Sequence, residues 1–198
     1  GTLTANGNAR FAPAALHNSP AFSAAAFVPA ITTCPGLLKF TAETISPVSL
    51  AVNVMTQDLR TSREIASYTK NGEVIRLTAV PEVAAMFQQA VQQDLNAKGF
   101  QIVQGAANAN VVVNIRKFFA TVEQGNLRYK ADAQVSVKVA VQGSKGNFSK
   151  NFNATRGYEG AFGASNDEIK KVLDQAYSDV VKAIYNDNEI ANAIHQFK

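Results

Sequence analysis

The sequence predicts an α+β fold in which two amphipathic helices cover one face of an antiparallel sheet. The segment 128–141 alternates between apolar and polar residues, which is typical of a strand with one buried and one solvated face. Segments at about 81–98 and 166–186 carry apolar residues at intervals of three and four, which is typical of amphipathic helices. An apolar sheet face and two apolar helix stripes are expected to meet as a two-layer sandwich, followed by a short C-terminal helix.

The chain divides into an arm and a body. At 198 residues it has room for one domain and an appendage. Residues 1–36 carry a single charged residue, Arg10, and four prolines that interrupt any helix or central strand. We expect this segment to be an irregular N-terminal arm and residues 37–198 to be a single α+β domain. The expected anchors of the arm on a partner chain are its phenylalanines, Phe11, Phe22 and Phe27.

The body begins with short elements. Alternation from Leu50 to Met55 predicts a first strand, and Gln57–Ser62 is interpreted as a loop. Glu73–Thr78 follows an Asn-Gly turn and predicts a second strand. Pro81 is expected at the first position of a helix that ends at Gly99, and Phe100–Val103 is expected to form another short strand.

A meander at about 109–158 forms the centre of the expected sheet. Its strands are predicted at Asn110–Val122, Arg128–Val141 and Phe148–Tyr158, joined by connections that contain Gly or Asn. Inward residues of the middle strand, such as Val137, are expected to pack under the helices. The inward residues expected to be buried are Tyr129, Val135, Val137 and Val139. The helix residues expected to cover them are Val172, Leu173, Val180 and Phe87.

The stretch Tyr158–Asn166 is expected to lead the chain into the long helix. Ser165 and Glu168 have the spacing of a capping box, and Phe162 is expected to pack as an apolar anchor. The alternative interpretation is a ligand loop with Tyr158 and Glu159 as contacts. Asn186 or Asn188 is expected to start the terminal helix, which runs to Phe197.

Basic residues gather on the outer side of the meander. Strand alternation puts Arg128, Lys130 and Lys138 on one face, and the chain has a net charge of +4. A solvated polar face accounts for most of this pattern. The alternative is a salt-sensitive site for an acidic partner or an anionic polymer.

No catalytic, metal or cofactor site is predicted. The two histidines, His17 and His195, lack ligands at metal-binding spacing, and no nucleophile elbow or phosphate loop occurs. The single cysteine, Cys34, excludes an internal disulfide. Phe118 and Phe119 are better explained by packing than by base stacking, so no nucleic-acid partner is expected, and no apolar run is long enough to span a membrane.

Three segments resemble the YajG family of bacterial lipoproteins. They are Leu77–Val83 with Leu95–Phe100, then Gln124–Tyr129, then Tyr158–Asn166, and the similarity extends from about Val48 to Phe197. The resemblance implies a Gram-negative envelope protein, exported and tethered on the periplasmic side of the outer membrane through a lipidated cysteine. It implies no enzymatic activity, because the family has no established one.

The sequence offers alternatives for the tether and for the partner. Cys34 stands about where the family has its lipidated cysteine, but Thr33 before it is a poor lipobox residue. A plain cysteine, or an anchor before Gly1, is the alternative. We expect a non-enzymatic binding or structural subunit with protein partners in the envelope. The alternative is a carrier of a small ligand, or a binder of an anionic polymer such as peptidoglycan or lipopolysaccharide.

Overall fold

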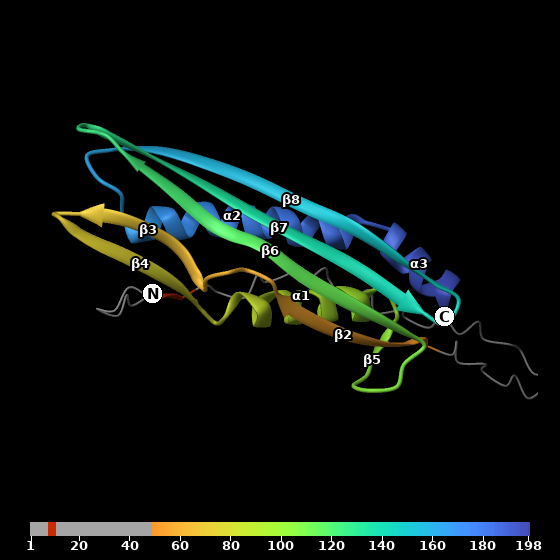
Figure 1. The fold of residues 1–198 in the computed structure, drawn as a ribbon. Helices are drawn as coiled ribbons and strands as arrows, with labels where there is room; N and C mark the ends of the chain where they lie inside the picture. The colour runs from red at the N-terminus through yellow and green to blue at the C-terminus, as the bar shows by residue number, and fades with distance from the viewer. Residues whose placement is uncertain (1–7, 11–48) are drawn as a thin grey trace, which may run out of the picture.

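The computed structural model describes residues 8–10 and 49–198 of the chain. Its elements in chain order are β1 (Asn8–Arg10), β2 (Ala51–Asp58), β3 (Glu64–Lys70), β4 (Glu73–Val80), α1 (Val83–Ala97), β5 (Gln101–Ile102), β6 (Ala109–Gln124), β7 (Arg128–Gly143), β8 (Gly146–Ala161), α2 (Asn166–Asn186) and α3 (Glu189–Phe197). The predicted α+β class is confirmed: a single sheet is covered on one side by helices (Figure 1).

The antiparallel meander β6–β7–β8 runs the length of the molecule. Each of its strands has 16 residues, a few more than the sequence predicts. Beyond the meander the sheet is mixed, because β2 and β3 both run parallel to β6 along its second edge. β4 then returns antiparallel to β3, and β1 adds parallel to β4.

The strand β3 is missing from the sequence-based description. Ile65 and Ala66 are both buried beside a register shift in the β3–β4 ladder, so the alternation that identifies a strand is broken there. The loop predicted at Gln57–Ser62 starts later than expected, because β2 continues through Asp58. A second shift, between Ile115 and Lys117 of β6, lies opposite the break between β2 and β3.

The helix α1 starts later than expected and ends as expected. Glu82 has extended backbone angles (φ −59°, ψ 146°), so the helix begins at Val83 and not at Pro81. At the other end, Gly99 has a φ of 92°, and its N–H donates to Asn96 O. The N–H of Phe100 donates to Leu95 O, which completes a Schellman motif.

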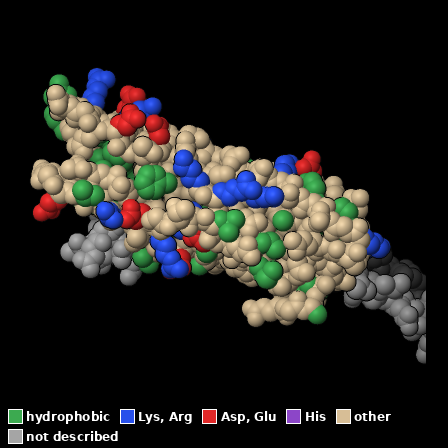
Figure 2. Space-filling model, viewed as in Figure 1, with side chains coloured by type: hydrophobic (Ala, Val, Ile, Leu, Met, Phe, Trp, Pro, Cys, Tyr) green, Lys and Arg blue, Asp and Glu red, His purple; other side chains and the backbone are tan. Residues whose placement is uncertain are grey.

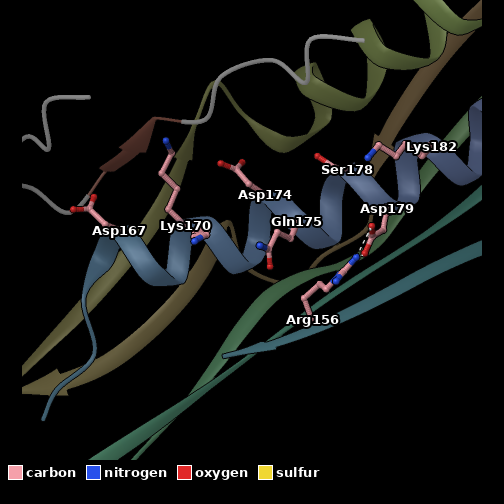
Figure 3. Close-up of a pocket in the computed structure, with 9 residues that line it drawn as sticks. Arg156, Asp167, Lys170, Asp174, Gln175, Ser178, Asp179 and Lys182 are labelled. Atoms are coloured by element: carbon pink, nitrogen blue, oxygen red, sulfur yellow. Dashed lines mark hydrogen bonds and ion pairs between the residues drawn. The ribbon is translucent and has the colours of Figure 1, made fainter. Parts of the chain in front are cut away.

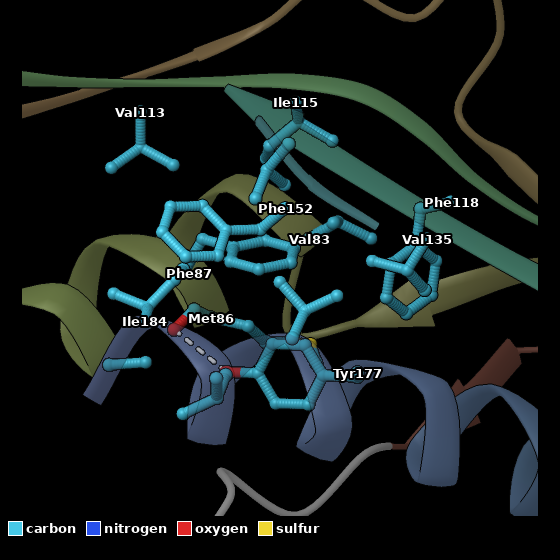
Figure 4. Close-up of a cluster of buried hydrophobic side chains, with 14 of the residues drawn as sticks. Val83, Met86, Phe87, Val113, Ile115, Phe118, Val135, Phe152, Tyr177 and Ile184 are labelled. Atoms are coloured by element: carbon cyan, nitrogen blue, oxygen red, sulfur yellow. Dashed lines mark hydrogen bonds between the residues drawn. The ribbon is translucent and has the colours of Figure 1, made fainter. Parts of the chain in front are cut away.

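The predicted core is confirmed. Tyr129 and the inward valines of β7 are at most 2% exposed, and the helix residues assigned to cover them are buried in the same cluster. Phe87, Phe118 and Tyr177 form edge-to-face ring pairs at its centre, with centroids 5.0 to 6.5 Å apart. The Tyr177 hydroxyl donates to Met86 O at 3.1 Å, which joins α2 to α1 (Figure 4).

The terminal helix is capped by a residue that the sequence analysis did not select. Asp187 Oδ1 accepts hydrogen bonds from the N–H groups of Glu189 and Ile190, whereas Asn188 makes no side-chain cap. Lys98 donates to Asp187 O at 2.9 Å, so the end of α1 is tied to the α2–α3 junction. Lys98 Nζ also lies 3.5 Å from the buried Asp94 Oδ1, in a partly buried ion pair.

The Asp94→Asn variant should be more stable than the wild type at pH 7 and no more stable at pH 4. Burial raises the pKa of Asp94 to about 6, and Lys98 offsets this only in part. The unfolded carboxyl ionises at its ordinary, lower pKa, so the folded state loses stability as the pH rises from about 4 to about 6. The upper limit of the effect is about 3 kcal/mol.

Urea unfolding at several pH values measures this effect. Glu73→Gln, which neutralises an exposed carboxylate on β4, serves as the control and should show no such rise. A stability difference between Asp94→Asn and wild type that does not change with pH would contradict the assignment.

Candidate functional site

Two loops that are distant in sequence meet at one end of the sheet. The β6–β7 hairpin turn closes through the Gly125 N–H, which donates to Arg128 O at 2.8 Å. Just beyond the end of β8, the Phe162 N–H donates to Leu127 O at 2.9 Å. We call this end of the molecule, made of residues 124–128 and 161–163, the tip. Two of the three segments that resemble the YajG family, Gln124–Tyr129 and Tyr158–Asn166, therefore form one structural unit.

Tyr129 holds the two segments together. Its ring lies directly under Gly160, where an added Cβ would be only 2.4 Å from Tyr129 Cε1. A larger residue at position 160 would therefore displace the ring. Tyr129 also packs against Tyr158, with ring centroids 6.1 Å apart, and its buried hydroxyl has no hydrogen-bond partner in the described part of the chain.

Polar contacts fix the connection from β8 to α2. Ser165 Oγ accepts from the Glu168 N–H at 3.3 Å, which confirms the predicted N-cap. The Glu168 side chain does not complete the capping box, because its Oε1 accepts from the Tyr158 hydroxyl at 3.0 Å. The Tyr68 hydroxyl on β3 donates to Asn166 Oδ1. The start of α2 is thus held from both the meander and the β3–β4 hairpin.

The expectation that Phe162 packs as an anchor in the body is wrong. Its side chain is 81% exposed, beside Leu127 at 72%. The neighbouring Ala164 is only 2% exposed, and the Tyr129 ring, also 2% exposed, occupies the space under Gly160. Phe162 also has a φ of 72°, a left-handed conformation that a bulky residue rarely adopts. Figure 2 shows hydrophobic side chains at this end of the molecule.

The predicted basic face divides into two parts. Lys130 forms an ion pair with Asp132 at 3.2 Å, which raises its pKa, and it stands between Glu123 and Glu159 in the strand register. Lys138 lies eight residues further along β7, a distance of about 27 Å. Arg128 therefore lies in the tip and Lys130 lies just beside it among charges of both signs, whereas Lys138 does not lie near them.

Lys138 has other basic neighbours that strand alternation did not reveal. The register shift in β6 exposes both Arg116 and Lys117, which lie opposite the part of β7 that carries Lys138. Among the described residues, no acidic side chain forms an ion pair with any of the three. We call Arg116, Lys117 and Lys138 the central basic cluster.

The two basic residues of β8, Lys150 and Arg156, face the helices. Arg156 Nε donates to Asp179 Oδ2 at 2.6 Å, and Arg156 Nη2 donates to Asp179 Oδ1 at 3.0 Å. Lys150 forms ion pairs with Asp187 and Glu189. These residues clamp the edge strand to α2 and α3.

A hollow of about 540 Å³ follows the exposed side of α2 (Figure 3). It is lined by charged and polar side chains such as Lys170 and Asp174. Partial burial raises the pKa of Asp174 to about 6, against the opposing effect of Lys170. Ser178 lines the hollow, but among the described residues no histidine lies beside it to act as a base. His195, the histidine within the described residues, packs on Phe100 with ring centroids 5.2 Å apart. The hollow therefore shows no nucleophile with its base.

The sites predicted in the N-terminal arm fall mostly on residues that the structure does not describe. Phe11, His17, Phe22, Phe27 and Cys34 lie outside the described residues. The adjoining Asn8–Arg10 pairs with Thr78–Val80 of the same chain. Within 8–10 and 49–198, no three His, Cys, Asp or Glu side chains converge as metal ligands. None of the helices described is long and apolar enough to cross a membrane.

The Phe162→Gly variant should be more stable than the wild type by about 0.5–1 kcal/mol. Glycine adopts a positive φ without strain, and an exposed ring contributes little packing to the isolated chain. Thermal and urea unfolding measure the difference, with Phe162→Ala as the control that removes the ring and keeps the strained backbone. A loss of stability in both variants would show that the ring packs on the body.

Comparison with known proteins agrees with the resemblance. A family model described as "Uncharacterized lipoprotein" matches residues 41–195. The uncharacterised lipoprotein YajG of Escherichia coli strain K12, and its counterpart in strain O6:H1, are each 27% identical over 153 residues, or 76% of this chain and 79% of theirs. The crystal structure of a Xanthomonas campestris protein shares the fold, with a TM-score of 0.55 at 13% identity over 76% of this chain and 90% of that one. The chain therefore belongs to the YajG family of uncharacterised lipoproteins.

Proposed function

We propose that the protein is a non-enzymatic component of the Gram-negative cell envelope that binds a protein partner through the tip. Membership of a lipoprotein family supports the envelope location. The observation that carries the binding proposal is the exposed Phe162, held in a strained backbone conformation where two family-like segments meet. Strained, exposed residues of this kind are concentrated at functional sites.

The tip has the features of a small protein-binding surface. Phe162 and Leu127 are adjacent apolar side chains, and each would gain about 1.5–3 kcal/mol if a partner buried it. Arg128, Lys130 and Glu159 surround them with charges of both signs, which is typical of the polar rim around an apolar contact. The tip is preorganised by Tyr129 and Gly160, so binding would order few additional groups.

The proposed attachment to the envelope is through the N-terminal arm. A lipidated cysteine, with Cys34 as one candidate, would tether the chain to the periplasmic side of the outer membrane. Phe11, Phe22 and Phe27 remain candidate contacts with a neighbouring chain of the assembly. The pairing of β1 with β4 holds at least part of the arm on its own body, which would limit the reach of these contacts.

A second candidate function rests on the central basic cluster. Three cations without an acidic partner among the described residues could bind an anionic polymer such as peptidoglycan or lipopolysaccharide, with a strong dependence on salt. The carrier hypothesis has less support. A carrier needs an enclosed apolar pocket, and the hollow on α2 is lined by charged side chains.

Photo-crosslinking in cells tests the protein-binding proposal. A photoreactive amino acid at position 162 should give a discrete crosslinked band, and Leu127→Ser in the same chain should reduce that band severalfold without lowering the expression of the protein. The matched control is the same amino acid at Leu59, which is 56% exposed but lies away from the tip. It should not give this band.

Two results would oppose the proposal. Equal crosslinking from positions 162 and 59 would show that the tip has no special partner. Salt-sensitive binding to purified peptidoglycan or lipopolysaccharide that is lost in Lys117→Glu and kept in Leu127→Ser would instead favour the second candidate.

A further inference from the structure

The long edge of β8 is open in the described part of the structure. Among the strands of residues 8–10 and 49–198, β7 is the one that pairs with β8. The Phe162 N–H bonds to Leu127 O in the same ladder, so the even-numbered residues of β8 bond to β7. The odd-numbered residues, from Asn147 to Ala161, therefore direct their N–H and C=O groups toward the open edge. All of these odd-numbered residues are exposed.

This edge lacks the usual protection against strand addition. Natural edges carry prolines, bulges or charges that an added strand would bury. β8 has no proline, and its register with β7 is continuous over 16 residues. Its helix-facing charges, Lys150 and Arg156, are already neutralised by carboxylates of α2 and α3. A further strand could add without burying an unpaired charge.

The helix beside this edge has a charge pattern that is complementary to itself. α2 packs against both β7 and β8. The side of α2 toward β8 carries Glu168 and Asp179, which bond to Tyr158 and Arg156 of β8. The residues that share a helical stripe with these two are Glu168, Lys171, Gln175, Asp179 and Lys182, and we call them the α2 row. Figure 3 shows Gln175 and Asp179 pointing toward the side of Arg156. Reversing this row about Gln175 exchanges each acidic residue with a lysine.

We infer that a second copy of this chain adds antiparallel to β8, with a two-fold axis that passes near Thr155 and Gln175. Rotation about the axis places Glu168 opposite the partner's Lys182. It also places Lys171 opposite the partner's Asp179. The inference does not rest on the proposed partner binding at the tip, which is a different surface.

The strand and the helix give the same position for the axis. Lys150 contacts Asp187, and Tyr158 contacts Glu168. The strand advances eight residues between these contacts, or about 27 Å, while the helix advances 19 residues, or about 28 Å, so the two run side by side. Gln175 is twelve residues from Asp187, about 18 Å along the helix axis, which brings it opposite Thr155 or Arg156.

The backbone also permits this register. Pairing Thr155 with its own copy brings odd-numbered residues together throughout, so the outward N–H and C=O groups of both strands meet. On the helix side, Phe152 falls opposite the partner's Tyr158, a favourable aromatic pair. Because α2 lies beneath β7 and β8, the two α2 helices would approach to about 10 Å, the ordinary packing distance.

Disulfide trapping of the full chain tests the axis. In a Cys34→Ser background, Thr155→Cys should form an intermolecular disulfide under mild oxidation, because a hydrogen-bonded antiparallel pair places its Cα atoms about 5.5 Å apart. Asn151→Cys is the matched control on the same strand. It would lie opposite the partner's Glu159, about 26 Å from its own copy, and should not crosslink.

Sedimentation equilibrium tests the charge pairing. Lys182→Glu should raise the dimer dissociation constant by about tenfold, because the symmetric contact is altered twice. Adding Glu168→Lys should restore most of the affinity. Lys70→Glu, which makes the same charge change on exposed β3, should have no effect. A chain that stays monomeric at its highest attainable concentration, or equal crosslinking of Thr155→Cys and Asn151→Cys, would overturn the inference.

Discussion

The structure depends on covering one side of β7. Every second residue from Tyr129 to Val141 is apolar and at most 2% exposed. At about 25 cal/mol per Å² of apolar surface removed from water, this face is a large favourable contribution to folding. β6 and β8 extend the face on either side, and α1, α2 and α3 cover it. The ring cluster of Phe87, Phe118 and Tyr177 fills the space where both long helices meet the sheet.

At one end of β7 the cover changes. The first inward residue, Tyr129, is packed under the backbone of Gly160 on the neighbouring strand. Just after Gly160 the chain turns away from the sheet, with Phe162 in a left-handed conformation and Ser165 capping α2. As a result, the segment that starts the long helix also exposes two apolar side chains. The same residues therefore serve the fold and form the proposed binding surface.

Periodicity predicted the elements that are long and regular. β7 alternates with the single exception of Ala140, and α2 repeats at three and four, because each has one face buried along its whole length. β3 could not be found in this way, since Ile65 and Ala66 are adjacent and both buried. The register shift at Ile115–Lys117 likewise exposes Arg116 and Lys117 together, which is why the central basic cluster was not foreseen.

The candidate site could be predicted only in part. The sequence identified Tyr158–Asn166 and the Ser165 cap, because glycines and capping residues act locally. Burial of Phe162 was wrongly expected, because the ring that packs under this segment is Tyr129, which is 33 residues away in the sequence and reaches Gly160 only when β7 and β8 pair. Strand alternation did not assign Lys150 and Arg156 to a side of the sheet, and their ion pairs with helix carboxylates place them on the inner side.

The central claim is that Tyr129 and Gly160 hold the two tip segments as one unit. Hydrogen exchange on the Gly160→Ala variant tests it most directly, because the added methyl group would displace the Tyr129 ring. The claim predicts faster amide exchange in both residues 124–128 and residues 161–165, with exchange in α1 unchanged. Faster exchange confined to residues 161–165 would contradict it, because the two segments would then be independent.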